Sequence, residues 1–314
     1  MSSGGGTRAI VAALGANLGI AVTKFAAYAL TGSSSMLAES IHSVADSGNQ
    51  LLLLIGGRRA GRAATPQHPF GYGRERYIYA FIVSVVLFSV GGLFALYEGF
   101  HKLRHPEPID SWQWVPIVVL LVAIGLESFS FRTAIHESNL TRGSLSWVQF
   151  IRRAKAPELP VVLLEDFAAL IGLVLALAGV GLTLATDDGR WDGAGTVCIG
   201  VLLVCVAVVL AIETKSLLLG EGATAESVGR IEAALVADPG VLRVIHMKTM
   251  HLGPEELLVA AKIAVPPTDS AAEVARVIDA AEVRVRAAEP IARVIYLEPD
   301  IDHGVAGAGD GPVD

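Results

Sequence analysis

The sequence has few charged residues, few aromatic residues and only two cysteines. Asp, Glu, Lys and Arg make up 18% of its 314 residues, against about 25% in an average soluble domain. Two cysteines cannot build a disulfide framework, and Cys198 and Cys205 lie in one apolar block, where we expect them to be small packing residues. A basic excess is also missing, because the net charge is −7, which argues against nucleic acid as a partner.

The arrangements that mark common enzymes are missing too. No nucleophile or phosphate-binding arrangement stands out, and the glycine-rich "GAGDG" at 307–311 follows no predicted strand and precedes no predicted helix. The N-terminal "MSSGGG" lacks the basic region and the small-residue cleavage site of a secretory signal, so we expect the first helix to be retained. The sequence therefore predicts a protein that is not an enzyme and needs no cofactor.

Long apolar blocks are what the sequence does contain. Hydrophobic residues make up 53% of the chain, and the mean hydropathy is +0.55, which indicates an integral membrane protein. About 20 apolar residues are needed to cross a bilayer as a helix. Six spans of this kind are predicted, near residues 8–30, 34–56, 77–100, 114–136, 159–185 and 193–214. The second is the least apolar, as expected of a helix that faces a polar interior rather than lipid.

The loop charges predict the orientation of these spans. Basic residues gather between the second and third spans and between the fourth and fifth, whereas the opposite loops carry few. Under the positive-inside rule, the N-terminus and everything after the sixth span lie in the cytoplasm. The basic residues of the two loops are Arg58, Arg59, Arg62, Arg74, Arg76, Arg142, Arg152, Arg153 and Lys155.

Ionisable residues interrupt the second span. His42 and Asp46 are four positions apart, a spacing that places two side chains on one face of a helix. An imidazole and a carboxylate so arranged supply two ligands for a divalent cation such as zinc. The alternative is that the two side chains only bond to each other or line a helix contact. Inside a membrane span we favour the ion-binding interpretation, because buried ionisable residues there mark ion paths.

A second pair of carboxylates lies in the fifth span. Glu165 and Asp166 stand in "LPVVLLEDFAALIGLVLALAG", and a tetrahedral metal site needs about four ligands. Adjacent helical residues diverge by about 100°, so both reach one ion only if it sits between helices. In the alternative, Glu165 caps the helix or pairs with a basic residue of the preceding loop. If the helix begins near Leu159, both residues lie too far inside it for capping.

These residues carry a resemblance to a known family. Six spans, the pair in "MLAESIHSVADSGNQ" (36–50), the loop "HPFGYGRERY" (68–77) and "LLEDFAALIG" (163–172) are similar to the cation diffusion facilitator family of metal/proton antiporters, in particular its zinc transporter nine-like branch. The resemblance implies a secondary transporter that moves divalent metal, zinc before all others, out of the cytosol in exchange for protons. It also implies a homodimer, with the metal and protons as its small partners and the bilayer around it.

The sequence departs from the family pattern at two places. Most zinc-exporting members carry a histidine four residues before the aspartate of the fifth span, where this chain has Val162. We therefore take Glu165 as the replacement, so that the predicted site consists of His42, Asp46, Glu165 and Asp166. This harder ligand set keeps manganese, iron and cobalt open beside zinc. In the loop, Tyr72 replaces a second histidine, so we expect no complete metal site on His68.

The resemblance also fixes the expected domains. Residues 1–217 form a six-helix transmembrane metal-transport domain, residues 218–300 a cytoplasmic ferredoxin-like dimerisation domain, and residues 301–314 a disordered tail. Helices at 224–237 and 270–289 and strands at 241–252, 256–265 and 291–298 give the order αββαβ. The positions that match metal ligands of family members are Ile245, Lys262, Tyr296 and Glu298, so at most one ligand remains there.

Two functions stay open at this point. The first is the antiporter, in a membrane of the bacterial plasma membrane type. The second is a non-transporting membrane scaffold or partner-binding protein of the same fold, which the missing histidine and the ligand-poor C-terminal domain favour. The presence of Glu165 in place of the missing histidine argues for the antiporter. A metal site that no longer functions would be free to lose its buried carboxylates.

Overall fold

The computed structural model describes residues 3–107, 109 and 112–302, with side chains from residue 17 onward. The chain divides into two compact units. The first contains Met1–Ala63 and Arg74–Leu218, and the second contains Ala64–Gly73 and Leu219–Asp314. The predicted tail at 301–314 falls outside the described residues after Asp302.

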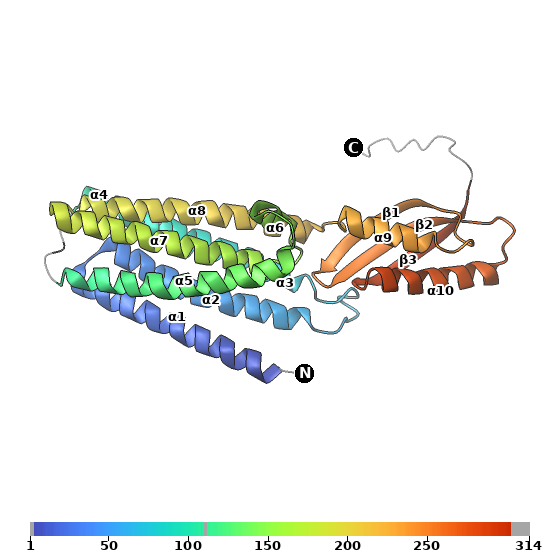
Figure 1. Ribbon diagram of the computed structural model, residues 1–314, viewed down its shortest axis with the longest axis horizontal. Helices are drawn as coiled ribbons and strands as arrows, with labels where there is room; N and C mark the ends of the chain where they lie inside the picture. The colour runs from blue at the N-terminus through green and yellow to red at the C-terminus, as the bar shows by residue number, and fades with distance from the viewer. Residues whose placement is uncertain (1–2, 108, 110–111, 303–314) are drawn as a thin grey trace. The chain divides into compact units, whose positions relative to one another are not determined.

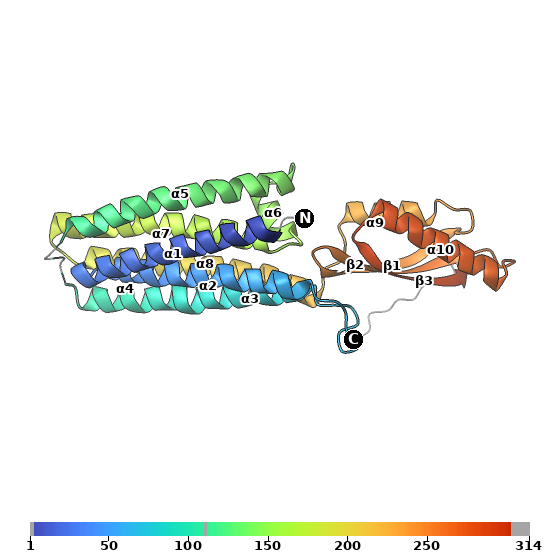
Figure 2. The same ribbon diagram turned by 90° about the horizontal axis from the view of Figure 1, so that it is seen from below.

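The first unit is a bundle of long helices that run side by side in both views (Figures 1 and 2). Each predicted span lies within a long helix, and most of these helices continue past the apolar block at one end or both. The elements are α1 (Ser3–Thr31), α2 (Ser34–Ala60), α3 (Glu75–Val86), η1 (Leu87–Leu93), α4 (Phe94–Arg104), α5 (Trp114–Arg142), α6 (Trp147–Arg153), α7 (Glu158–Thr186) and α8 (Arg190–Leu219).

Over the described residues, four helices are long and apolar enough to cross a membrane. They are Glu75–Arg104, which joins α3, η1 and α4, together with α5, α7 and α8. Helices α1 and α2 are also long, at 29 and 27 residues, but are not among these four. The third span contains a π-helical segment, η1, which the sequence pattern does not predict.

Short polar signals set the ends of several helices. Ser33 caps α2, because its side chain accepts a hydrogen bond from the backbone N–H of Met36. Ser146 and Gln149 form a capping box at the start of α6, a short helix that was not predicted. Its "SWVQ" signature at 146–149 was available in the sequence.

Helices α4 and α8 approach each other closely at glycines. A Cβ atom at Gly99 would lie 2.7 Å from the backbone nitrogen of Val197, and one at Gly200 would lie 2.7 Å from that of Leu96. Both gaps are too small for a side chain. Glycines at these two positions therefore permit the close packing of α4 and α8.

The second unit is a three-stranded sheet with two helices on one face (Figure 2). Its elements are α9 (Ala225–Leu235), β1 (Arg243–Gly253), β2 (Glu256–Val265), α10 (Ala271–Ala288) and β3 (Ala292–Ile301). The strand order is β1-β2-β3, with β1 antiparallel and β3 parallel to β2. The predicted order αββαβ is therefore confirmed. Residues of both helices, such as Ile231 and Val285, form one core with β2 residues such as Val259.

The loop 64–73 belongs to this second unit. Thr65 and His68 form a backbone bridge, and the ring of Tyr72 lies 4.6 Å from that of His68. A Cβ atom at Gly73 would come within 2.7 Å of the carbonyl oxygen of Leu252, so the loop packs tightly against the β1–β2 hairpin. This contact requires a residue without a side chain at position 73, the second glycine of "HPFGYGR".

Candidate metal-binding site

Helix α2 buries polar side chains along most of its length. Eight of its polar residues from Ser34 to Asn49 are buried, among them Glu39, His42, Ser43 and Asn49. This face is turned toward the bundle, because α2 packs between α1, α3 and α7. Burial of so many polar groups is costly unless they are partnered or reserved for an ion.

His42 and Asp46 lie together, as their spacing predicts. The Nε2 atom of His42 is 3.4 Å from an oxygen of Asp46. His42 is 2% exposed, and within the described part of the chain neither of its ring nitrogens has a hydrogen-bond partner. The second oxygen of Asp46 is likewise without one among these residues. Buried ring nitrogens and a buried carboxylate oxygen without hydrogen-bond partners are groups that can bind a cation.

Glu165 and Asp166 on α7 point to different neighbours. Glu165 accepts a hydrogen bond of 2.7 Å from the side chain of Asn49 on α2, whereas Asp166 accepts one of 2.9 Å from the hydroxyl of Ser130 on α5. The residue preceding α7 is Pro157, so neither carboxylate is a cap. Both side chains are buried, and both lie two turns inside the helix, as predicted.

The four predicted ligands are not gathered around one point. No group of three or more His, Cys, Asp or Glu side chains close enough to hold a metal is found among the described residues. His42 and Asp46 form one half, and Glu165 joins the same helix through Asn49. Asp166 is held on the α5 side. The four-ligand site therefore stays a prediction.

Two further acidic residues near α2 have partners on a neighbouring helix. Glu39 is not a cap; it is fully buried, and one of its oxygens lies 3.0 Å from the ammonium of Lys24 on α1. Asp192 of α8 accepts hydrogen bonds from the backbone N–H groups of Ser34 and Ser35, at 2.7 and 3.2 Å, so it completes the cap of α2. A lysine in one apolar helix and a glutamate in the next are a sequence signal for a buried pair.

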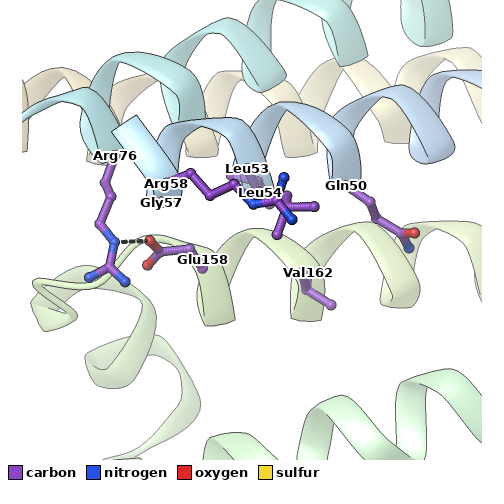
Figure 3. A pocket seen from close by; sticks show the side chains of 8 residues that line it. All are labelled: Gln50, Leu53, Leu54, Gly57, Arg58, Arg76, Glu158 and Val162. Atoms are coloured by element: carbon purple, nitrogen blue, oxygen red, sulfur yellow. Dashed lines mark ion pairs between the residues drawn. The ribbon is translucent and has the colours of Figure 1, made fainter. Parts of the chain in front are cut away.

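A cavity of about 530 Å³ opens at the arginine-rich end of α2 and α7 (Figure 3). Gln50 and Val162 line it, each one helical turn beyond a predicted ligand, Asp46 and Asp166 respectively. An ion pair of 2.9 Å between Arg76 of α3 and Glu158 of α7 lies in its wall. On both helices the cavity therefore begins about one turn from a predicted ligand.

The C-terminal unit holds a lysine where the family pattern would place a ligand. The ammonium of Lys262 lies 3.3 Å from Glu298 and 2.9 Å from Asp300. These carboxylates raise the pKa of Lys262, because they accept hydrogen bonds from its charged form. The ammonium of Lys262 on β2 thus already lies beside the acidic residues Glu298 and Asp300 of β3. Its positive charge makes the binding of a metal ion there unfavourable.

Comparisons with known proteins place the chain in a family. The model of the cation efflux transmembrane domain matches residues 10–219, more than half of the chain. The Xenopus laevis protein named "Proton-coupled zinc antiporter SLC30A9, mitochondrial" is 34% identical over 242 residues, 76% of this chain and 43% of that protein. Its Homo sapiens counterpart is 34% identical over 232 residues, 73% of this chain and 41% of that protein.

A plant protein extends the comparison. "Metal tolerance protein C4" of Arabidopsis thaliana is 28% identical over 258 residues, which is 82% of this chain and 56% of that protein. The chain spans less than half the length of the two antiporters it matches. The family match and the helical membrane domain agree with the resemblance found in the sequence. The chain belongs to the cation efflux, or cation diffusion facilitator, family of metal transporters.

Proposed function

We propose that this protein exchanges divalent metal ions, zinc first among them, for protons across a membrane. The observation that carries the proposal is His42, whose two ring nitrogens are buried without hydrogen-bond partners among the described residues, 3.4 Å from Asp46. A neutral imidazole and carboxylates are ligands that zinc accepts. The names of the frog and human relatives, proton-coupled zinc antiporters, support the same exchange.

The ion is bound by His42, Asp46, Glu165 and Asp166, from α2 and α7. Closing this site leaves one oxygen of Glu165 bonded to Asn49 and turns its other oxygen toward Asp46, while Asp166 turns from Ser130 to face Asp46 as well. A carboxylate-rich set is harder than a histidine-rich one, so manganese, iron and cobalt are the competing substrates. The cavity at Gln50 and Val162 is the route to the site from the arginine-rich side.

Protons and metal compete for the same atoms, and this competition couples their movements. Metal binding requires a neutral imidazole and ionised carboxylates, so an arriving ion releases protons, and arriving protons release the ion. Exposure of the site first on one side and then on the other converts the competition into antiport.

The remaining architecture of the proposal follows the family. Helices α1 and α2 join the four apolar spans to make six crossings, and both termini lie on the arginine-rich, cytoplasmic side. The C-terminal unit is a ferredoxin-like domain that serves homodimerisation. The frog and human antiporters carry the word mitochondrial in their names, whereas the sequence led us to expect a bacterial-type plasma membrane. The proposal requires only that the membrane carry a proton gradient.

Metal flux into proteoliposomes with an imposed proton gradient tests this proposal. The wild-type protein is compared with Asp46→Ala and Asp166→Ala, and zinc, manganese, iron and cobalt are measured in parallel. We expect zinc flux in the wild type and its loss in both variants. Equal flux in all three proteins would contradict the proposal and favour the non-transporting scaffold. Ser47→Ala is the matched control, because the Ser47 hydroxyl donates its hydrogen bond to the carbonyl oxygen of Ser43 in its own helix.

A further inference from the structure

A buried ion pair, Lys24 and Glu39, lies beside the proposed metal site, and neither residue is one of the four proposed ligands. Lys24 of α1 is 1% exposed and Glu39 of α2 is fully buried. The ammonium of Lys24 donates hydrogen bonds of 3.0 Å to Glu39 and 2.8 Å to the hydroxyl of Ser43. Two charges removed from water are retained only where their contacts or their function compensate for the loss of hydration.

The contacts of Glu39 are incomplete for a pair that only joins two helices. Lys24 binds one carboxylate oxygen, Oε2, while the other, Oε1, is buried without a hydrogen-bond partner in the described part of the chain. Oε1 points at α7, since a Cβ atom placed on Gly172 would lie 2.9 Å from it. A free carboxylate oxygen therefore faces the helix that carries Glu165 and Asp166.

Glu39 also lies in line with the proposed ligands. It precedes His42 by three residues and Asp46 by seven, which are spacings of one helical face. On α7, Gly172 follows Glu165 by seven residues and shares its face in the same way. Glu39 meets Gly172, and Asn49 meets Glu165, so the two helices run antiparallel with matching faces. Glu39 thus lies about 10 Å from Asp46 along α2, two turns further from the arginine-rich cavity.

We propose that Glu39 is a second cation-binding position on the transport path, and that Lys24 is the resident cation that occupies it when no metal is there. The inference rests on the proposed transport function. An ion that leaves the first site away from the cavity passes His42 and next meets the free oxygen of Glu39. Lys24 neutralises this carboxylate between ions, so that a second metal ion does not settle there and block release. Because the ammonium is tethered, it leaves Glu39 without leaving the protein.

Equilibrium zinc binding to the full-length protein in detergent tests the resident cation. The bound zinc per chain is counted for the wild type, Lys24→Met and the double variant Lys24→Met/Glu39→Gln. We expect Lys24→Met to bind one more zinc ion than the wild type, because the carboxylate is freed. The double variant should return to the wild-type number. An unchanged number in folded Lys24→Met would overturn the inference.

A glycine substitution tests the same position without removing a charge, should Lys24→Met fail to fold. Gly172→Ala places a methyl group against Oε1 of Glu39, whereas Gly181→Ala on the same helix meets nothing within 4 Å. We expect Gly172→Ala to slow zinc turnover about tenfold, the size of effect seen when a group supporting a metal site is displaced. Its zinc affinity at the first site should stay unchanged, and Gly181→Ala should match the wild type.

The two proposals fail in different ways. If the wild type neither binds nor moves zinc, both are overturned. If the wild type moves zinc while Gly172→Ala turns over at the same rate, the role of Glu39 is overturned and the proposed function stands. A Lys24–Glu39 pair that only joins α1 to α2 would change the thermal stability of the variants and leave zinc number and turnover as they are.

Discussion

Asn49 of α2 donates a hydrogen bond of 2.7 Å to Glu165 of α7, and this bond connects the two helices that carry the predicted metal ligands. Both residues are buried, and the other side-chain atom of Asn49, Oδ1, has no partner among the described residues. The bond holds Glu165 on the α2 side of the bundle, near the helix that carries His42 and Asp46. Asn49 is therefore expected to position a ligand rather than to bind the metal.

Replacement of Asn49 by alanine should weaken zinc binding. Loss of a residue that orients a metal ligand typically costs 10- to 100-fold in affinity, so we expect a decrease of about tenfold. Isothermal titration calorimetry of the detergent-solubilised protein measures it. Ser47→Ala, also buried on α2, should bind zinc as the wild type does. Identical affinities in Asn49→Ala and the wild type would show that Glu165 needs no support from α2.

Asp192→Ala should destabilise the membrane domain. Asp192 is fully buried and accepts hydrogen bonds from the backbone of Ser34 and Ser35 and from the hydroxyls of Ser33 and Ser34. Loss of such a cap leaves buried donors unsatisfied, and we expect about 2 kcal/mol less free energy of unfolding.

Thermal unfolding in detergent measures this effect. Asp192→Asn keeps one acceptor oxygen and should lose less than Asp192→Ala. If both variants unfold at the wild-type temperature, the carboxylate does not stabilise the start of α2.

Glu273 should make the stability of the C-terminal unit dependent on pH. Its carboxylate accepts hydrogen bonds from the hydroxyl and backbone N–H of Ser270, in the capping box of α10. These bonds lower the pKa of Glu273. A group whose pKa is lower in the folded state contributes stability above its usual value of about 4.3 and loses it as the pH falls through the folded value.

The difference in unfolding temperature between the wild type and Glu273→Gln measures this contribution. We expect the wild type to be more stable at pH 6 and the difference to shrink as the pH falls below about 4. Glu282→Gln, at a residue of the same helix that pairs with Arg286, keeps the capping box intact and is the matched control. A difference that stays constant from pH 6 to pH 3 would exclude the charge of Glu273 as its cause.

The fold was largely predictable because its elements depend on local patterns. Apolar blocks located the long helices of the bundle. The alternation of apolar and polar residues located the strands of the second unit. The π-helical segment η1 was not predictable, because its hydrogen-bond shift depends on packing against other helices. The short helix α6 was missed although the capping box of Ser146 and Gln149 marks it.

The residues of the candidate site could be predicted from the sequence, but their hydrogen-bond partners on other helices could not. The spacing of His42 and Asp46 placed them together, since four residues make about one helical turn. The sequence gives no distance between helices, so it did not show that Asn49 holds Glu165 or that Ser130 holds Asp166. The place of Glu39 near the start of a helix suggests a cap. Its true partner, Lys24, lies on another helix, where local patterns carry no information.

The central claim is that metal and protons compete for the same buried groups. Calorimetric zinc titrations in buffers of different ionisation enthalpy measure the number of protons released for each zinc ion bound. We predict a release that is clearly above zero in the wild type, zinc binding that weakens as the pH falls, and the loss of both in Asp46→Ala. Zinc binding with no proton release, or with the same release in Asp46→Ala, would contradict the account.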